Sequence, residues 1–245
     1  MGSSDDVRRS ELVASLGALR GRIADACAAA GRPALSVTLI AITKTYPAAD
    51  AATLAELGVG DMGESRDQEA SAKAAAVREL LPQREVRWHF VGRLQRKKSR
   101  SVASYAHAVH SVDRPELATA LADAVRAEID HAGRAPMQVF VQASLDGDPG
   151  RGGVVRAELP AVADAVARRP ELILRGVMAV APLDADPEAA FADLATLSEE
   201  LRTRHPDADA ISAGMSQDLE QAVSYGATHL RVGTALLGRR PPILG

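Results

Sequence analysis

Eight short apolar runs alternate with helical segments along this chain, and this alternation constrains the fold more than any other feature. The clearest run is VTLIAI at residues 37–42, which is rich in β-branched residues and is followed by Lys44 and Pro47. A short run that is apolar on both faces is typical of a buried strand in a parallel sheet covered by helices. The predicted strands are residues 37–42, 59–64, 86–92, 106–112, 137–144, 172–180, 208–213 and 228–233.

The segments between these strands are rich in alanine or carry apolar residues at helical spacing. A leading helix is expected over residues 7–30 and is ended by Gly31 and Pro33. Asp50, the SRDQ box at residues 65–68 and Asp113 are expected to cap three later helices. The other predicted helices are residues 51–57, 65–81, 95–103, 113–130, 154–168, 187–204 and 217–225, with a last turn at 235–238.

The length of 245 residues is close to that of a single (β/α)8 barrel, roughly 250. No linker long enough to separate two domains interrupts the alternation. A doubly wound open sheet is the alternative, but the chain lacks a GxGxxG motif after the first strand. We therefore predict an α/β fold, a single TIM barrel with an extra N-terminal helix. Residues 7–245 form the domain and residues 1–6 a flexible tail.

Composition excludes several classes of protein. The net charge of −3 gives no general attraction to nucleic acid, and the single cysteine, Cys27, excludes an intrachain disulfide. No apolar stretch approaches the ~20 residues of a membrane span, and the N-terminus lacks the apolar core of a signal peptide. His107 and His110 are three apart on a predicted strand and should face opposite sides, so no metal site is expected. These features predict a cytoplasmic protein without membrane or nucleic-acid partners.

Lys44 stands at the carboxyl end of the first predicted strand, where α/β barrels place their reactive groups. Taken alone, it is best explained as a strand-end lysine whose stem covers the apolar rim. The alternative is an amine with a lowered pKa that forms a Schiff base with a carbonyl compound. The choice depends on what else lies at the same mouth.

The loops after the seventh and eighth strands have the features of a phosphate site. Gly214-Met215-Ser216 leads into a helix, and Gly233-Thr234 offers a second close backbone approach with a hydroxyl. Individually these residues would be an ordinary N-cap and a tight turn. Arg231, within the eighth strand, is either a structural ion-pair residue or a ligand to an anion or acceptor. A lysine facing a phosphate site suggests a phosphorylated aldehyde, and pyridoxal 5′-phosphate (PLP) fits best.

Six motifs then identify a family. They span most of the chain in order: AITKTYP at 41–47, GES at 63–65, WHFVGRLQRKK at 88–98, RGVMA at 175–179, SAGMSQD at 212–218 and RVGTALLG at 231–238. With these motifs the chain resembles the YggS/PROSC family of PLP homeostasis proteins. The resemblance implies a fold type III PLP-binding barrel, like the N-terminal domain of alanine racemases without the extra β-domain.

The resemblance also implies roles for particular residues. Lys44 would carry PLP covalently as an internal aldimine. The phosphate would be held by Ser216, Gly233 and Thr234 together with the neighbouring Met215, with Arg231 close by and Ser212 assisting. His89 would line the cavity. Three departures from the family pattern concern Ser65, which replaces an asparagine, Arg93 and Lys97 in the basic motif, and Arg151 where the family usually has lysine.

Three functions are compatible with these features. The first is a PLP-binding protein without catalysis that stores, protects or delivers the cofactor to PLP-dependent client enzymes, expected to be a monomer. The second is a PLP-dependent amino-acid racemase of narrow range, for which Tyr46, His89 and Tyr225 are the candidate second bases. Alanine racemases obtain that base from a second domain, for which a chain ending at Gly245 has no room. The third is a cofactor-free aldolase-type lyase acting on a sugar phosphate.

Overall fold

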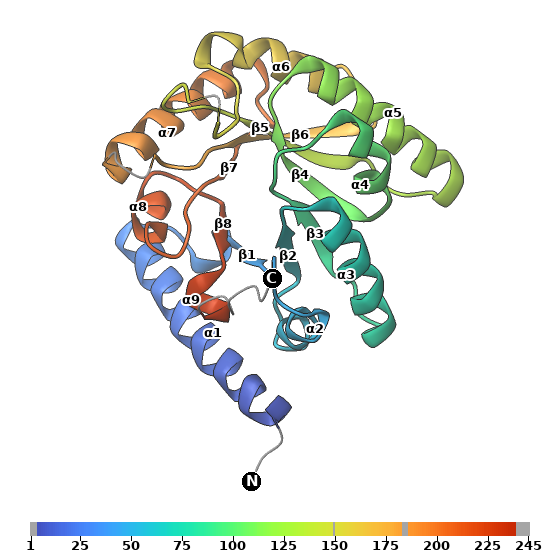
Figure 1. The fold of residues 1–245 in the computed structure, drawn as a ribbon. Helices are drawn as coiled ribbons and strands as arrows, with labels where there is room; N and C mark the ends of the chain where they lie inside the picture. Colours follow the sequence, from blue (N-terminus) through green and yellow to red (C-terminus); the bar gives the residue numbers. More distant parts are fainter. Residues whose placement is uncertain (1–3, 149, 183–185, 239–245) are drawn as a thin grey trace.

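The chain folds into a closed barrel of eight parallel strands surrounded by helices (Figure 1). The structure is a computed structural model and describes residues 4–148, 150–182 and 186–238. Each strand pairs in parallel with the next, and β8 closes the barrel on β1. The strands are β1 (Thr38–Ile42), β2 (Asp61–Glu64), β3 (Arg87–Phe90), β4 (Ala106–Val112), β5 (Met137–Gln142), β6 (Leu172–Met178), β7 (Ala210–Ser212) and β8 (His229–Val232).

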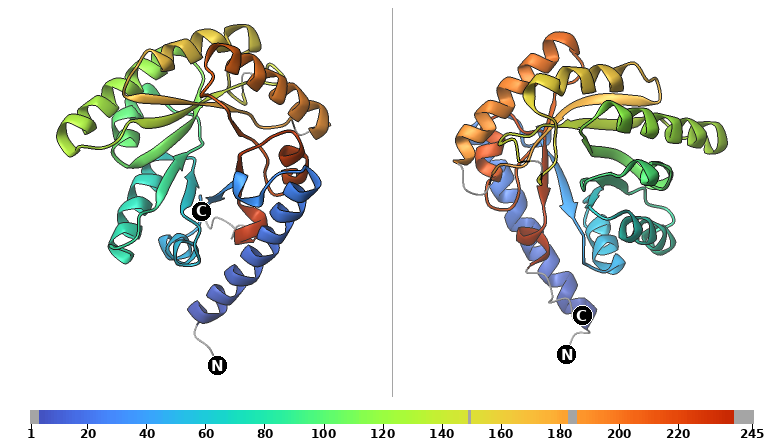
Figure 2. Two further views of the ribbon diagram at one scale, coloured as in Figure 1. Left: turned by 180° about the vertical axis from the view of Figure 1, so that it is seen from behind. Right: turned by 45° about the horizontal axis from the view of Figure 1, so that its top comes forward.

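The helices form the outer layer and follow the strands in chain order around the barrel, as the two further views show (Figure 2). The α-helices of the described residues are α1 (Ser4–Ala29), α2 (Ala48–Glu56), α3 (Asp67–Leu80), α4 (Ser99–Tyr105), α5 (Pro115–Ala132), α6 (Leu159–Ala167), α7 (Pro187–Arg204), α8 (Leu219–Ser224) and α9 (Thr234–Leu237). Three short 3₁₀ turns are η1 (Ala34–Ser36), η2 (Arg96–Lys98) and η3 (Arg156–Glu158). The predicted TIM barrel with a leading helix is therefore confirmed.

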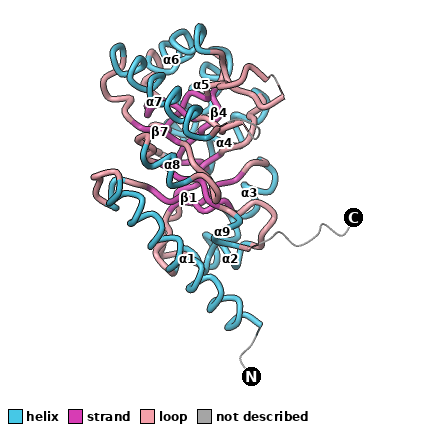
Figure 3. The backbone as a smooth tube through the Cα atoms, turned by 90° about the vertical axis from the view of Figure 1, so that its left-hand side faces the viewer, coloured by secondary structure: helices cyan, strands magenta, loops and turns pink. Residues whose placement is uncertain are grey.

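The extra helix α1 lies outside the repeating β/α pattern and packs on α8 and α9 (Figure 3). Its buried face is formed by Leu12, Leu16, Leu19 and Ile23, in the spacing expected of an amphipathic helix. The helix begins at Ser4 and so includes part of the stretch expected to be a tail, whereas residues 1–3 lie outside the described residues. None of the helices in the described ranges has the length and apolar character needed to cross a membrane.

The three predicted helix caps are wrong. The helix α2 starts after Pro47, and Asp50 is instead buried in its first turn, where Arg8 of α1 donates to the carboxylate at 2.7 Å. The N-cap of α3 is Arg66 and that of α5 is Arg114, and neither makes a side-chain capping bond. For Asp50 the side chain serves a contact between two helices, which a local capping pattern does not show.

His107 and His110 both reach the interior of the barrel, although they were expected to face opposite sides. The β3–β4 pairing slips by one residue between Trp88 and His89, which is the signature of a bulge. Past the bulge, the ring of His89 lies 5.8 Å from that of His107 and 5.1 Å from that of His110. In the described part of the chain no group of three His, Cys, Asp or Glu side chains is arranged to hold a metal ion.

Candidate functional site

The carboxyl mouth of the barrel gathers the candidate residues because all eight strands run in the same direction. Lys44 follows β1, Ser65 follows β2, the stretch 213–216 follows β7, and Gly233 follows β8. Since β1 neighbours both β2 and β8 in the barrel, Lys44 lies between the β2 end and the β8 end. The structure thus brings together residues that are nearly 190 positions apart in the sequence.

The two loops with phosphate-site features are joined directly. Ser216 Oγ accepts a hydrogen bond from the backbone N–H of Ala235 at 3.1 Å, and the Arg231 N–H donates to the Gly214 carbonyl at 2.9 Å. Gly233 lies against β1, because a Cβ added there would stand 3.4 Å from the carbonyl oxygen of Ile42. Ser216, Gly233 and Thr234 are therefore held at one edge of the mouth, next to the strand that leads to Lys44.

Gly214 occupies a conformation that only glycine adopts without strain, at φ +90°. A Cβ there would stand 2.6 Å from Ala222 Cβ and 2.7 Å from Leu230 Cδ2, which is too close for any side chain. The backbone therefore passes tightly between α8 and β8 just before Met215 and Ser216. This close passage fixes the position of the loop.

Substituting Gly214 with alanine should destabilise the fold more than the same change at Gly226, which has an identical φ of +90° but 3.7 Å of clearance. Gly226→Ala should cost about 1–2 kcal/mol of unfolding free energy from backbone strain alone. Gly214→Ala should cost about 1–3 kcal/mol more because of the added overpacking. Urea unfolding of both variants measures the difference. Equal losses would show that the loop is not closely packed.

Arg231 is a buried cation without a carboxylate contact among the described residues. Its Nη1 donates to the carbonyl and the hydroxyl oxygens of Ser212, at 2.6 and 2.7 Å, and its Nη2 donates to the carbonyl of Ala179 at 2.8 Å. Burial lowers the pKa of Arg231 to about 10, and the charge of Asp218 partly opposes that shift. A buried guanidinium with neutral partners is well suited to a ligand that brings negative charge or a strong acceptor.

Behind Arg231, a chain of hydrogen bonds crosses the barrel interior. Ser212 Oγ lies 2.8 Å from His110 Nδ1, and His110 Nε2 lies 2.8 Å from His89 Nδ1. His89 Nε2 lies 2.9 Å from Asp61 Oδ1. With both imidazoles neutral, each group can donate to the next one, from Arg231 through Ser212, His110 and His89 to Asp61. Every bond of the chain then has one donor and one acceptor. The buried cation and the buried anion thereby fix the tautomers of both rings.

The pKa values agree with this arrangement. Burial acts to raise the pKa of Asp61, but hydrogen bonds from His89 and Arg87 outweigh it and hold that pKa well below its usual range. Complete burial, with repulsion from Arg231, lowers the pKa of His110 well below 6.5. Asp61 therefore remains the anion and His110 the neutral ring at physiological pH.

The buried histidines make stability depend on pH. Burial, with repulsion from Arg175, lowers the pKa of His229 from 6.5 to about 4. Because its folded pKa is below its unfolded value, the unfolded chain binds the proton first as pH falls. Stability is therefore full above pH 6.5 and is lost towards pH 4, by about 2 kcal/mol at pH 5 from His229 alone.

Urea unfolding at pH 7.5, 6 and 5 tests this pH dependence, and His110 adds to it in the same direction. His229→Gln should reduce the loss between pH 7.5 and 5, because glutamine does not titrate. An unfolding free energy that stays constant over this range, or that falls equally in the variant, would contradict the assignment of His229 as a neutral buried ring.

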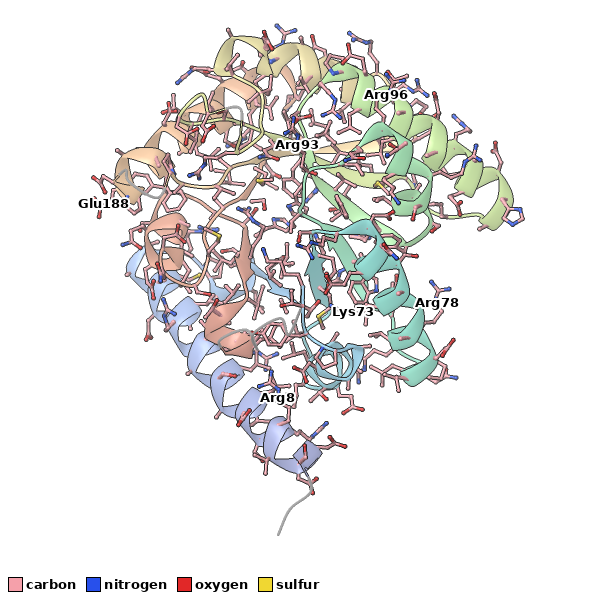
Figure 4. The ribbon with its side chains drawn as sticks, in the orientation of Figure 1. Arg8, Lys73, Arg78, Arg93, Arg96 and Glu188 are labelled. Carbon is pink, nitrogen blue, oxygen red and sulfur yellow. The ribbon has the colours of Figure 1, made fainter. Side chains whose placement is uncertain are left out.

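A buried ionic cluster supports the turn that carries Lys44. Lys73 of α3 donates to Glu64 at 2.6 Å, to Glu69 at 3.0 Å and to the carbonyl of Thr43 at 2.7 Å. Glu69 in turn accepts from the backbone N–H of Thr45, whose φ of +72° is unusual for a β-branched residue. Lys73 points from α3 towards the strands, whereas Arg78 on the same helix points outward (Figure 4). Lys44 therefore sits between two residues, Thr43 and Thr45, that this cluster holds.

Lys73 is a functional residue that the sequence motifs do not mark, although Glu69 and Lys73 stand four residues apart on a helix, a spacing that favours an ion pair. Glu64 belongs to the GES motif, but its partner could not be named from the sequence. Burial raises the pKa of Glu64, against the opposing effects of Lys73 and Thr43. Burial also acts to raise the pKa of Glu69, but the Thr45 N–H and Lys73 lower it overall.

His89 is the candidate that the structure places elsewhere. Its imidazole is buried between Asp61 and His110, and it lines a pocket at the amino-terminal mouth rather than the loops around Ser216. His110 and Ser212 separate it from Arg231 in the hydrogen-bond chain. The alternation of a strand shows which residues face inward, but not at which height of the barrel they lie. A chain of hydrogen bonds through His110 and Ser212 connects His89 to Arg231.

Comparison with known proteins agrees with this geometry. Residues 14–241 match the family described as alanine racemase, N-terminal domain. The pyridoxal phosphate homeostasis protein of Mycobacterium bovis is 47% identical over 244 residues, covering 95% of this chain and 94% of that protein. The protein of the same name from Escherichia coli is 35% identical over 234 residues, covering 94% and 97%.

Solved structures of the same fold are also similar to this chain. PipY of Synechococcus elongatus, in its structure with PLP bound, superposes with a TM-score of 0.73 at 34% identity, covering 88% of this chain and 100% of that one. Alanine racemase from Corynebacterium glutamicum has a TM-score of 0.67 at 15% identity, which shows the fold alone, and the match covers 94% of this chain and 63% of that one. The chain therefore belongs to the YggS/PROSC family of pyridoxal phosphate homeostasis proteins, whose barrel corresponds to the N-terminal domain of alanine racemases.

Proposed function

We propose that this protein binds PLP at the carboxyl mouth of the barrel and serves PLP homeostasis by storing, protecting or delivering the cofactor, without turnover of its own. The observation that carries the proposal is the placement of Lys44 beside the joined loops of Ser216 and Gly233. The relatives named PLP homeostasis proteins and the PLP-bound structure of PipY support the same ligand.

The residues at the mouth fit the cofactor. The close backbone passages at Gly214 and Gly233 fix the two joined loops that carry the Ser216 and Thr234 hydroxyls, the groups proposed to hold a phosphate. The buried Arg231 offers a cation to the ring or the phosphate, and Ser212 holds that guanidinium in place. We propose Met215 as a contact in the same loop, whose backbone N–H donates to the Asp218 carboxylate, and Ser65 as a polar contact from the β2 side. Bound PLP supplies an aldehyde carbon that a lysine amine attacks reversibly.

We propose Lys44 as the point of covalent attachment. The chain has four lysines. Lys73 is engaged by two carboxylates and a carbonyl, and Lys97 and Lys98 are exposed on η2. Lys44 is partly buried at the end of β1, within the turn held by Thr43 and Thr45. A shielded amine at that place is the one able to react with an aldehyde held in the phosphate loops.

A racemase needs a second acid or base over the cofactor ring, and the candidate side chains have other tasks. The Tyr46 hydroxyl donates to the carbonyl of Gly238 at 2.8 Å, and His89 is bonded to Asp61 and His110. Tyr225 packs against the hydrophobic core at the end of α8. These contacts favour a carrier over a racemase.

Two assays on the PLP-loaded protein test the proposed function. The first follows conversion of L-alanine and other amino acids to their D-forms. The second follows reactivation of the cofactor-free form of a PLP-dependent enzyme. We expect no racemisation beyond that of free PLP, and reactivation that increases with the amount of loaded protein. Repeated turnover of an amino acid would contradict the proposal, as would failure to reactivate.

The remaining properties of the proposed role can be tested alongside. We propose a cytoplasmic monomer whose partners are PLP-dependent client enzymes. Sedimentation of the PLP-loaded protein should give the mass of one 25.7 kDa chain. A dimer would contradict the expected oligomeric state without affecting the cofactor site.

A further inference from the structure

The amino-terminal mouth of the barrel, opposite to Lys44, contains a second pocket that the proposed function does not use. It has a volume of about 370 Å³ and is lined by the first residues of the strands, including Thr38, Gln138 and His229. We call it the lower pocket. In TIM barrels this end usually serves stability, and side chains fill it. An open pocket there with a polar lining therefore needs an explanation.

Two polar groups of the lower pocket lack partners. Ser36 Oγ and Arg175 Nε are buried, and neither has a hydrogen-bond partner among the described residues. Both residues line the pocket. A buried donor left without an acceptor is costly, by about 1–3 kcal/mol. Turning the two side chains towards an acceptor inside the lower pocket would satisfy both groups.

The pairing of the charged side chains around the lower pocket indicates which kind of acceptor it would bind. Arg87 and Asp61 form a close pair at 2.6 Å and compensate each other. Arg175 forms no ion pair with any residue in the described ranges, and the Asp209 carboxylate on the rim is exposed to solvent. Although the two arginines and two aspartates of the lining balance in formal charge, Arg175 is a guanidinium without a close carboxylate, which favours an anion at its side of the pocket.

The elements that supply the donors indicate the shape of the anion. Hydroxyls come from Ser36 and Thr38, an amide from Gln138 and a guanidinium from Arg175. These residues belong to η1, β1, β5 and β6, so they surround the pocket instead of lining one wall. A tetrahedral anion with several oxygens can accept from several directions at once.

We propose that the lower pocket binds a phosphate group, either as free phosphate or as part of a small phosphorylated metabolite. The site is separate from the cofactor mouth and does not rest on the proposed function. Arg175 would form the charged bond, and the Ser36 and Thr38 hydroxyls would complete the contacts from the side of β1.

The histidines give a direct test, because imidazole NMR signals report on the lower pocket and not on the cofactor. Three of the six histidines, His89, His107 and His229, line the pocket, whereas His131 lies on α5 and His205 at the end of α7, outside the pocket lining. The experiment titrates inorganic phosphate into the ¹⁵N-histidine-labelled full chain in a phosphate-free buffer. The His107 and His229 signals should shift and saturate, while those of His131 and His205 stay in place.

Substitutions test whether the shifts of the histidine signals come from phosphate bound in the lower pocket. Arg175→Met should weaken phosphate binding at least tenfold, since it removes a charged hydrogen bond. Ser36→Ala should weaken it several-fold and serves as the second variant if Arg175→Met does not fold. Ser216→Ala, at the opposite mouth, should leave these shifts unchanged. The proposal fails if no saturable shift occurs, if all histidine signals move together, or if Arg175→Met and Ser36→Ala both bind phosphate as the wild type does.

A second titration identifies the source of the phosphate. Glycerol 2-phosphate should compete with inorganic phosphate for the same His107 and His229 shifts. Tighter binding of the ester would assign the pocket to a phosphorylated metabolite, and tighter binding of inorganic phosphate would assign it to the free ion. Sodium chloride at equal ionic strength should cause no saturable shift. If chloride reproduces the phosphate shifts, the proposal is wrong.

Discussion

Replacing Lys44 with alanine should abolish covalent attachment of PLP while leaving the barrel folded. Lys44 stands in the turn after β1, outside the strand ladder, so the loss of its side chain removes no strand pairing. The phosphate loops at Ser216 and Gly233 would still bind PLP, but with no amine at the carbonyl carbon. The visible absorption band of lysine-bound PLP should therefore be absent from the variant, and borohydride should fix no cofactor.

Lys97→Ala is the matched control, because this exposed lysine of η2 also follows a strand at the carboxyl mouth. It should bind and retain PLP as the wild type does. Urea unfolding of both variants excludes loss of the fold as the cause. If the band persists in Lys44→Ala, or if Lys97→Ala also loses it, attachment at Lys44 is wrong.

Replacing Lys73 with methionine should strongly lower the free energy of unfolding, because it breaks a buried ion pair. The side chains of Lys73 and Glu64 are 5% and 1% exposed, so the change leaves a buried carboxylate without its cation. Breaking a buried ion pair in this way costs about 3–5 kcal/mol. The same change frees the carbonyl of Thr43, next to Lys44, and should also weaken PLP binding.

A double-mutant cycle separates the lost pair from the lost packing. Glu64→Gln removes the charge that Lys73→Met leaves behind, so the double variant should recover part of the stability. Arg78→Met, on the exposed side of α3 (Figure 4), should change the unfolding free energy by no more than about 0.5 kcal/mol. Additive losses from Lys73→Met and Glu64→Gln would contradict a coupled buried cluster.

The sequence was sufficient to predict the barrel because each buried strand is a local apolar run. The prediction for β4, residues 106–112, agrees with the structure to the residue, and that for β1 differs by one residue. Lys44 and the loops around Ser216 and Gly233 could be placed at one mouth because parallel strands share a direction. Positions that follow from chain direction and strand ends were therefore predictable.

The contacts between elements were not predictable. Asp50 has the sequence context of a cap, but a salt bridge from Arg8, 42 residues earlier, determines its role. A bulge in β4 turns His107 inward, and no residue type in that strand announces it. The height of His89 in the barrel depends on the stagger of neighbouring strands, which emerges only when the barrel closes.

Covalent attachment of PLP at Lys44 is tested most directly by borohydride reduction of the PLP-loaded wild-type protein, followed by peptide mapping. Reduction fixes the cofactor on whichever amine carries it. We expect a single modified peptide, containing Lys44, with no modification of Lys73, Lys97 or Lys98. Cofactor fixed on another lysine, or no cofactor fixed at all, would contradict the proposed site.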